Sequence, residues 1–173
     1  ACLVGSEMCI RDRTALEAER AITQERGIAA AVRTWKQWNG HPQGVATVND
    51  PWVAVEQHEE RPPLPAASDC SLLDGVRVLD FTRVIAGPTC SQLLASLGAD
   101  VLRIDPPNRP ELLEQHLSTG MGKRSSSIDL TTSREDLETL FSGADVVLLG
   151  YRPGSMTRFG LDPDDLFLSL IHI

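Results

Sequence analysis

Basic side chains stand beside the ends of apolar, strand-like runs in a chain whose formal net charge is −8. Arg83 follows one such run, and Arg152 and Arg158 follow another. Lys123 and Arg124 precede the short strand predicted at 125–130. In open α/β sheets, ligands bind beyond the carboxyl ends of the strands. Cations gathered at these turns therefore predict a site for an anionic small molecule, and a phosphorylated compound fits this chemistry.

The turn at 82–88 strengthens this interpretation, because Gly87-Pro88 opens an apolar-periodic helix directly after Arg83. The unpaired N–H groups at a helix N-terminus attract anions. A glycine there also lets the backbone approach a ligand closely. The loops at 105–110 and 150–155 complete the predicted binding edge.

The elements that position these loops alternate between strand and helix. Strands are predicted at 76–81, 101–104, 125–130 and 146–149. Helices are predicted after Pro88, over 111–117 and after a capping-box pattern at 132–135. This order indicates an α/β fold with a Rossmann-like, mostly parallel sheet and flanking helices. The first helix is expected to bury the side that carries Cys90, Leu93, Leu94 and Leu97.

A different region precedes this one. Residues 14–26 have the apolar spacing of an amphipathic helix, and 28–33 and 51–57 have strand-like patterns. Thr34 is placed to cap a short helix that carries Trp35 and Trp38. Residues 58–73, rich in proline, form the predicted linker between the two regions.

Composition and motifs exclude several classes of function. The acidic charge without a Lys/Arg cluster argues against nucleic-acid binding, and no apolar segment has the length of a membrane span. Only Cys70 and Cys90 stand away from the chain ends, which predicts a reducing, cytoplasmic location. His41 and His116 have no partners at metal-ligand spacing, so no metal site is expected.

Nicotinamide-dinucleotide binding is the competing interpretation. The strand at 76–81, the turn and helix after it, and the second strand that ends at Asp105 have the outline of a dinucleotide-binding unit. Its first turn, TRVIAGP, lacks the G-x-G-x-x-G pattern of such sites, so this alternative ranks second.

The two ends of the chain share an unusual relation. The terminal LSLIHI at 168–173 and MCIRDR at 8–13 can be encoded by opposite strands of one short DNA. That DNA resembles the transposase end of sequencing-library adapters. We therefore expect residues 1–13 and 168–173 to be adapter-derived and the chain to be a fragment.

Three ordered stretches carry a family resemblance: LLDGVRVLDFTRVIAGPTCSQLLASLGADVLRIDPP, GKRSSSIDL and ADVVLLGYRPGSMTRFGLDPDDL. They resemble the amino-terminal part of family III CoA-transferases, the CaiB/BaiF family, over about residues 72–167. The resemblance implies a CoA-binding, Rossmann-like region at 74–167. GIAAAVRTWKQWNGHPQG and PWVAV are similar to the late small domain of the same family. Residues 14–57 would then be the tail of one family unit, joined by the linker to the start of another.

The resemblance also implies a binding site for coenzyme A, which serves as a substrate with no metal. The residues that it assigns to CoA are Val84, Ile85, Ala86, Gly87, Lys123, Gly150, Tyr151 and Arg158. Many family members have a basic residue after the acidic residue that ends the second strand, whereas Pro106 follows Asp105 here. Arg103 or Arg109 is the expected substitute for that cation.

The chemistry implied by the resemblance is transfer of CoA between an acyl-CoA and a carboxylic acid through a covalent aspartyl intermediate. The matching Asp comes after the YRPG loop in the family, so no catalytic residue is assigned in this chain. An acyl-CoA racemase of the same fold, or a noncatalytic CoA-binding module, are the alternatives. The resemblance further implies a full-length homodimer.

Overall fold

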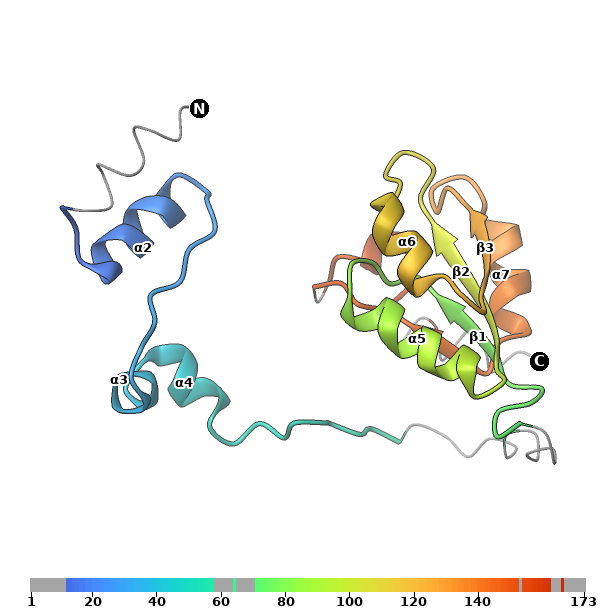
Figure 1. Ribbon diagram of the computed structural model, residues 1–173, viewed down its shortest axis with the longest axis horizontal. Helices are drawn as coiled ribbons and strands as arrows, with labels where there is room; N and C mark the ends of the chain where they lie inside the picture. Colours follow the sequence, from blue (N-terminus) through green and yellow to red (C-terminus); the bar gives the residue numbers. More distant parts are fainter. Residues whose placement is uncertain (1–11, 58–63, 65–70, 153, 163–165, 167–173) are drawn as a thin grey trace. The chain divides into compact units, whose positions relative to one another are not determined.

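The computed structural model describes residues 12–57, 64, 71–152, 154–162 and 166. The chain divides into two compact units, residues 1–57 and 58–173 (Figure 1). The predicted adapter-derived ends lie outside the described residues except for Asp12 and Arg13. Most of the predicted linker lies outside them too, but Ser71 and Leu73 already bond to the carbonyl of Leu97 in the second unit.

The described residues of the first unit form three short helices. Helix α2 (Ala15–Gln24) begins at a capping box between Thr14 and Glu17 and confirms the helix predicted over 14–26. Helix α3 (Trp35–Asn39) begins at Thr34, as predicted. Helix α4 (Pro42–Thr47) follows at once, because proline suits the first helical position and the His41 ring accepts the Gln43 N–H at 3.2 Å.

The strands predicted at 28–33 and 51–57 are wrong, because both segments are irregular. Their apolar side chains are exposed, with Ile28 at 99% and Val32 at 97% of full accessibility. A strand needs a neighbour to pair its N–H and C=O groups, and within the described residues of this unit neither segment has one. An alternating apolar pattern predicts a strand conformation, but it cannot show whether a neighbouring strand is present to pair with it.

The second unit is built on a four-stranded sheet in the order β3-β2-β1-β4. Its strands are β1 (Arg77–Asp80), β2 (Asp100–Asp105), β3 (Arg124–Ser127) and β4 (Val146–Leu148). All pairings are parallel, and Val78 faces Val101 on one side and Val146 on the other. The four predicted strands and the parallel sheet are therefore confirmed.

Three helices connect the strands: α5 (Ala86–Ser96), α6 (Leu113–Thr119) and α7 (Arg134–Ser142). Figure 1 shows α5 and α6 on one face of the sheet and α7 on the other. Right-handed crossovers require this arrangement, because the chain steps outward from β1 to β3 and then returns to β4. A short 3₁₀-helix, η1 (Thr157–Phe159), follows β4.

Each face of the sheet has its own apolar cluster. Val78, Val101 and Leu94 belong to the cluster beneath α5, and Leu79, Leu137 and Phe141 to the cluster beneath α7. Alternate residues of β1 thus point to opposite faces, and burial of their apolar area holds the helices on the sheet.

Two local predictions about the helices are wrong. Cys90 and Leu93 lie on the exposed side of α5, whereas Pro88 and Ser91 are buried against the sheet. Leu94 packs against the sheet as predicted, so the buried side is rotated from the predicted one rather than opposite to it. Apolar spacing missed position 91 because it carries a hydroxyl, which an acidic partner satisfies. At α7 no side-chain capping bond forms from Ser133, so the predicted capping box is absent.

Candidate functional site

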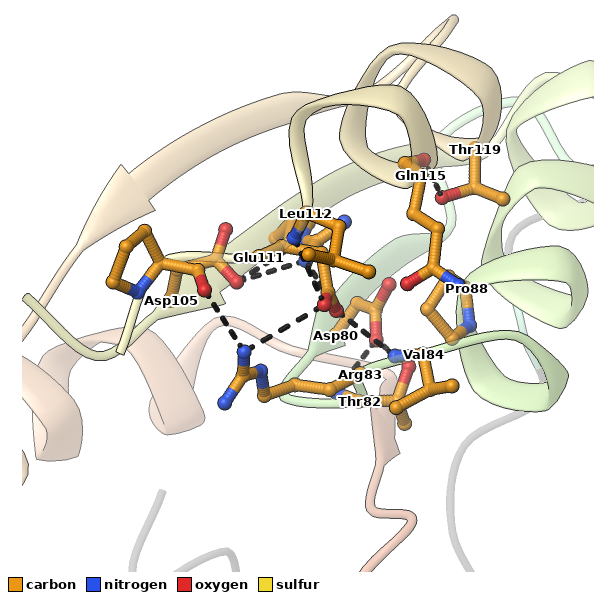
Figure 2. Close-up of polar contacts among 12 residues, drawn as sticks. Asp80, Thr82, Arg83, Val84, Pro88, Asp105, Glu111, Leu112, Gln115 and Thr119 are labelled. Carbon is orange, nitrogen blue, oxygen red and sulfur yellow. Dashed lines mark hydrogen bonds and ion pairs between the residues drawn. The ribbon is translucent and has the colours of Figure 1, made fainter. Parts of the chain in front are cut away.

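The loop after β1 is shaped by the carboxylate of Asp80, which is completely buried. Its Oδ1 accepts the Thr82 backbone N–H at 2.9 Å and also the Thr82 hydroxyl (Figure 2). Its Oδ2 accepts the hydroxyl of Ser91, in the second turn of α5. One acidic side chain therefore fixes both the loop and the helix that follows it, which is the structural reason for Asp at the end of this strand.

Lys123 completes this buried cluster from the start of β3. Its ammonium donates to the Pro88 carbonyl at 2.8 Å and to Ser91 Oγ at 2.5 Å, and lies 3.3 Å from Asp80 Oδ2. Only 1% of its side chain is exposed. Burial lowers the pKa of Lys123 from its ordinary value, and the charge of Asp80 opposes that shift.

The far end of the same loop is held by a second acidic residue, Glu111, on the segment between β2 and α6. Its Oε2 accepts the Val84 N–H at 2.9 Å, and its Oε1 lies 3.6 Å from Arg83 Nη2. Val84 has φ +72°, a left-handed conformation that is rare for a β-branched residue. Strained backbone of this kind occurs where the surroundings hold a binding loop in place.

A cavity of about 430 Å³ opens at the carboxyl ends of β1, β2 and β4. Arg83, Arg109, Tyr151 and Arg158 supply polar groups to its wall, while Phe81, Ile104, Met156 and Phe159 contribute apolar surface. The chain reverses direction across the sheet between β1 and β4, and ligands of open α/β sheets bind at such a switch point. The cavity therefore combines the position, size and charge expected for an anionic ligand.

Tyr151 and Arg158, in the wall of the cavity, are both affected by their surroundings. Burial raises the pKa of the Tyr151 phenol above its ordinary value of 10.0, so the phenol stays protonated at neutral pH. The Arg158 guanidinium lies 4.5 Å from the centre of the Phe159 ring. This aromatic contact orients a cation at the rim of the cavity.

The structure separates the eight residues predicted from the resemblance into three groups. Tyr151 and Arg158 line the cavity. Val84 and Ile85 lie outside the cavity wall and are exposed on the loop, at 56% and 63%. The others do not line it: Ala86 and Gly87 form the first turn of α5, Gly150 follows β4, and Lys123 is buried beneath α5.

The two candidate substitutes for the missing cation lie in different places. Arg109 lines the cavity. Arg103 is only 1% exposed and pairs with Asp105 and Glu111, at 2.9 and 3.4 Å. The sequence contained a signal for this burial: Arg103 lies two positions after Val101 in a strand, so both side chains point to the same face of the sheet. Nothing in the sequence indicated Glu111 as its partner.

The described ranges contain no cluster of three or more His, Cys, Asp or Glu side chains suited to a metal ion. Nor does any helix in those ranges have the length and apolar character needed to cross a bilayer.

Fold and site together define an α/β domain with a cavity and basic side chains at the carboxyl ends of its strands, and comparison with known proteins identifies its class. The sequence profile of CoA-transferase family III matches residues 73–167, more than half of the chain. The chain therefore belongs to CoA-transferase family III.

Individual relatives agree with this assignment. The probable fatty acyl-CoA transferase Rv3272 of Mycobacterium tuberculosis is 40% identical over 60% of this chain and 30% of its own length. A formyl-CoA:oxalate CoA-transferase of Rhodopseudomonas palustris is 36% identical over 54% of this chain and 25% of its own length. An acyl-CoA transferase of Gibberella moniliformis is 32% identical over 88% of this chain and 29% of its own length.

Solved structures show the same fold. The crystal structure of Rv3272 superposes with a TM-score of 0.50 at 41% identity, over 56% of this chain and 29% of that one. A CaiB/BaiF family protein from Brucella suis superposes with a TM-score of 0.52 at 29% identity, over 57% of this chain and 31% of that one. The chain spans less than a third of the length of these relatives.

Proposed function

We propose that the protein to which this chain belongs transfers CoA between an acyl-CoA and a carboxylic acid, and that residues 74–167 supply part of its CoA site. The observation that carries the proposal is the cavity at the switch point of the sheet, with Arg83, Tyr151 and Arg158 in its wall. Membership in the family and the names of the relatives, which are CoA-transferases, support it.

The proposed CoA contacts follow from the placement of the side chains. Phosphates of CoA are anions, and Arg83, Arg109 and Arg158 are the cations around the cavity. Tyr151 offers an aromatic face to the adenine. The backbone at Val84, Ile85, Ala86, Gly87 and Gly150 borders the same edge of the sheet. Lys123 contributes from beneath, because its buried ammonium holds the Pro88 carbonyl at the start of α5.

In the proposed reaction, an aspartate carboxylate attacks the thioester carbonyl, and the departing CoA thiolate leaves a mixed anhydride. The thiolate then attacks the aspartyl carbonyl, which releases the first acid and forms an aspartyl-CoA thioester. The second acid reverses these steps and departs with CoA. No metal or redox cofactor takes part.

We further propose that the nucleophilic aspartate is missing from this chain. Asp80 is completely buried and bonded to Thr82 and Ser91. Asp105 accepts two bonds from Arg103, and Asp145 accepts the Arg77 N–H. Asp129, which lines the cavity, accepts the Thr131 N–H and hydroxyl. Because these four carboxylates all have structural partners, we expect the chain by itself to bind CoA without transferring it.

The segment at 14–57 is proposed to be the small-domain end of a preceding family unit. The Gibberella moniliformis protein aligns over 88% of this chain, an extent that must include part of the first 57 residues. One related polypeptide therefore contains counterparts of both regions in the same order. By the family resemblance, the complete protein is proposed to be a cytoplasmic homodimer.

Calorimetric titration of the chain with CoA tests the binding proposal. Arg158→Gln should weaken CoA binding about tenfold, the value of one charge-assisted hydrogen bond. Arg124→Gln is the matched control, because it removes one cation at the amino end of the strands and should leave the affinity within about twofold. Absence of CoA binding, or equal losses in the two variants, would show the proposed site to be wrong.

The missing nucleophile is tested by incubating the chain with an acyl-CoA and a labelled free acid. We expect no label to enter the acyl-CoA pool. If label exchanges and Asp129→Asn abolishes the exchange, the aspartate that lines the cavity is a nucleophile after all.

A further inference from the structure

The carboxylate of Glu111 is surrounded by backbone N–H groups and guanidinium groups. It accepts the Val84 N–H at 2.9 Å and the Leu112 N–H at 3.2 Å. The guanidinium groups of Arg83 and Arg103 lie 3.6 and 3.4 Å from its oxygens. Two backbone donors and two arginines form the donor set that binds phosphate and carboxylate ligands. Figure 2 shows the contacts of Arg83 and Val84 converging on this one side chain.

Glu111 does not satisfy all of these donors. Arg83 Nε and Arg103 Nη1 are buried and have no hydrogen-bond partner among the described residues. The Arg103 side chain is 99% buried, at 1% exposure, and an unpaired buried donor in such a place calls for an explanation. Both oxygens of Glu111 are already engaged. A phosphate group offers more acceptor oxygens than a carboxylate and could reach these remaining donors.

Charge is consistent with the same interpretation. The Val84 N–H holds the pKa of Glu111 below its ordinary value of 4.5 against the opposing effect of burial, and Arg83 and Arg103 add to the lowering. Glu111 is therefore an anion at neutral pH. Arg83 also lines the cavity, as do Pro106 and Arg109 from the segment that carries Glu111. The donors thus adjoin the proposed CoA site.

We propose that Arg83, Arg103 and the Val84 N–H form a phosphate-binding site that Glu111 fills in the free protein, and that a phosphate group of the ligand displaces the Glu111 carboxylate. The inference rests on the proposed function, because it names the group that occupies part of that site before the ligand arrives. Glu111 lies just before α6, so the carboxylate can leave while the sheet stays intact.

Glu111→Gln tests the site with inorganic phosphate as the probe. Loss of the competing charge should tighten phosphate binding about tenfold, which corresponds to one charge-assisted hydrogen bond. Glu114→Gln removes the same charge from an exposed position three residues later and should change phosphate affinity less than about threefold. Acetate should gain less than phosphate in Glu111→Gln, because it cannot reach the extra donors.

Adding Arg83→Gln to Glu111→Gln should abolish the gain. Equal gains in the Glu111 and Glu114 variants, or an equal gain with acetate, would overturn the assignment. The unmodified chain provides a test that does not depend on how a variant folds. At saturating phosphate, the Glu111 carboxyl carbon and the Val84 amide should shift together in NMR spectra, and unchanged resonances would contradict displacement.

The result for CoA separates this inference from the proposed function. If CoA binds and Glu111→Gln gains no more phosphate affinity than its control, the displaced-carboxylate site is wrong and the CoA site stands. If phosphate shows the expected pattern and CoA does not bind, the anion site stands and the proposed function is wrong.

Discussion

Lys123 and Asp80 show how a family motif can act through a buried side chain. Lys123 belongs to the GKRSSSIDL stretch, and the family resemblance assigned it to the CoA site. In the fold its ammonium bonds to Ser91 and to the Pro88 carbonyl, and it is almost fully buried beside Asp80. We expect it to maintain the shape of the loop at 82–88.

Lys123→Met should therefore destabilise the second unit. Removing one partner of a buried ion pair leaves the other charge uncompensated, which costs about 3–5 kcal/mol in the free energy of unfolding. Arg124→Met is the control, because its ion pair with Asp100 is exposed and contributes about 0–1 kcal/mol. Urea denaturation followed by circular dichroism measures both. Equal losses would show that the buried pair has no special role.

Helix α5 sets the geometry at the carboxyl end of β1, since only Ile85 separates the helix from the strained Val84. Gly87 is the contact point between that turn and the loop. A Cβ at this position would lie 2.2 Å from Cβ and from Oγ1 of Thr82. The absence of a side chain thus lets the helix approach the loop that Asp80 fixes.

Gly87→Ala should push α5 away from the loop and cost about 1–3 kcal/mol in the free energy of unfolding, as other overpacked sites do. CoA affinity should fall with it, because Val84 and Ile85 move with the helix. Gly150→Ala is a suitable comparison, since its Cβ would meet Thr82 no closer than 3.4 Å and should change stability by less than about 0.5 kcal/mol. If Gly87→Ala were as stable as the unmodified chain, α5 would not need glycine at position 87 to pack against the loop.

At the scale of the whole molecule, the two units have different spectroscopic markers. The three tryptophans of the chain, Trp35, Trp38 and Trp52, all lie in the first unit, and the single tyrosine, Tyr151, lies in the second. Trp35 and Trp52 are exposed, at 77% and 105%. Tryptophan emission therefore reports only on the first unit. The β-sheet signal in circular dichroism comes from the second unit, which contains all the described strands.

We expect the two signals to change at different urea concentrations, because non-coincident transitions are the mark of units that unfold separately. Tryptophan emission should already resemble that of solvent-exposed indole before the sheet domain unfolds. Lys123→Met should shift the circular-dichroism transition and leave the emission curve unchanged. A single shared transition that Lys123→Met shifts in both signals would mean that the units are coupled.

The sequence by itself determined the parts of this protein that depend on local pattern. Apolar runs bounded by Gly, Pro and Asp predicted β1, β2 and β4, because a buried parallel strand needs an uninterrupted apolar segment. The polar, exposed strand β3 pairs with β2 at the edge of the sheet. Thr14 and Thr34 begin helices through bonds within three residues, which the sequence contains completely. The motifs that resemble CoA-transferase family III identified the class of protein, and the clustering of Arg83, Tyr151 and Arg158 at one edge followed from a parallel sheet.

Tertiary structure decided everything that depends on contacts between distant segments. Residues 28–33 have a strand-like pattern, but only a neighbouring strand could have stabilised that conformation. The buried side of α5 is chosen by Asp80 and Lys123, which lie 11 and 32 residues from Ser91 in the sequence. Glu111 reaches Val84 across 27 residues. The spacing of residues along the chain cannot predict these contacts. The energy of a buried charge depends on the groups beside it in the fold, and these come from distant parts of the sequence.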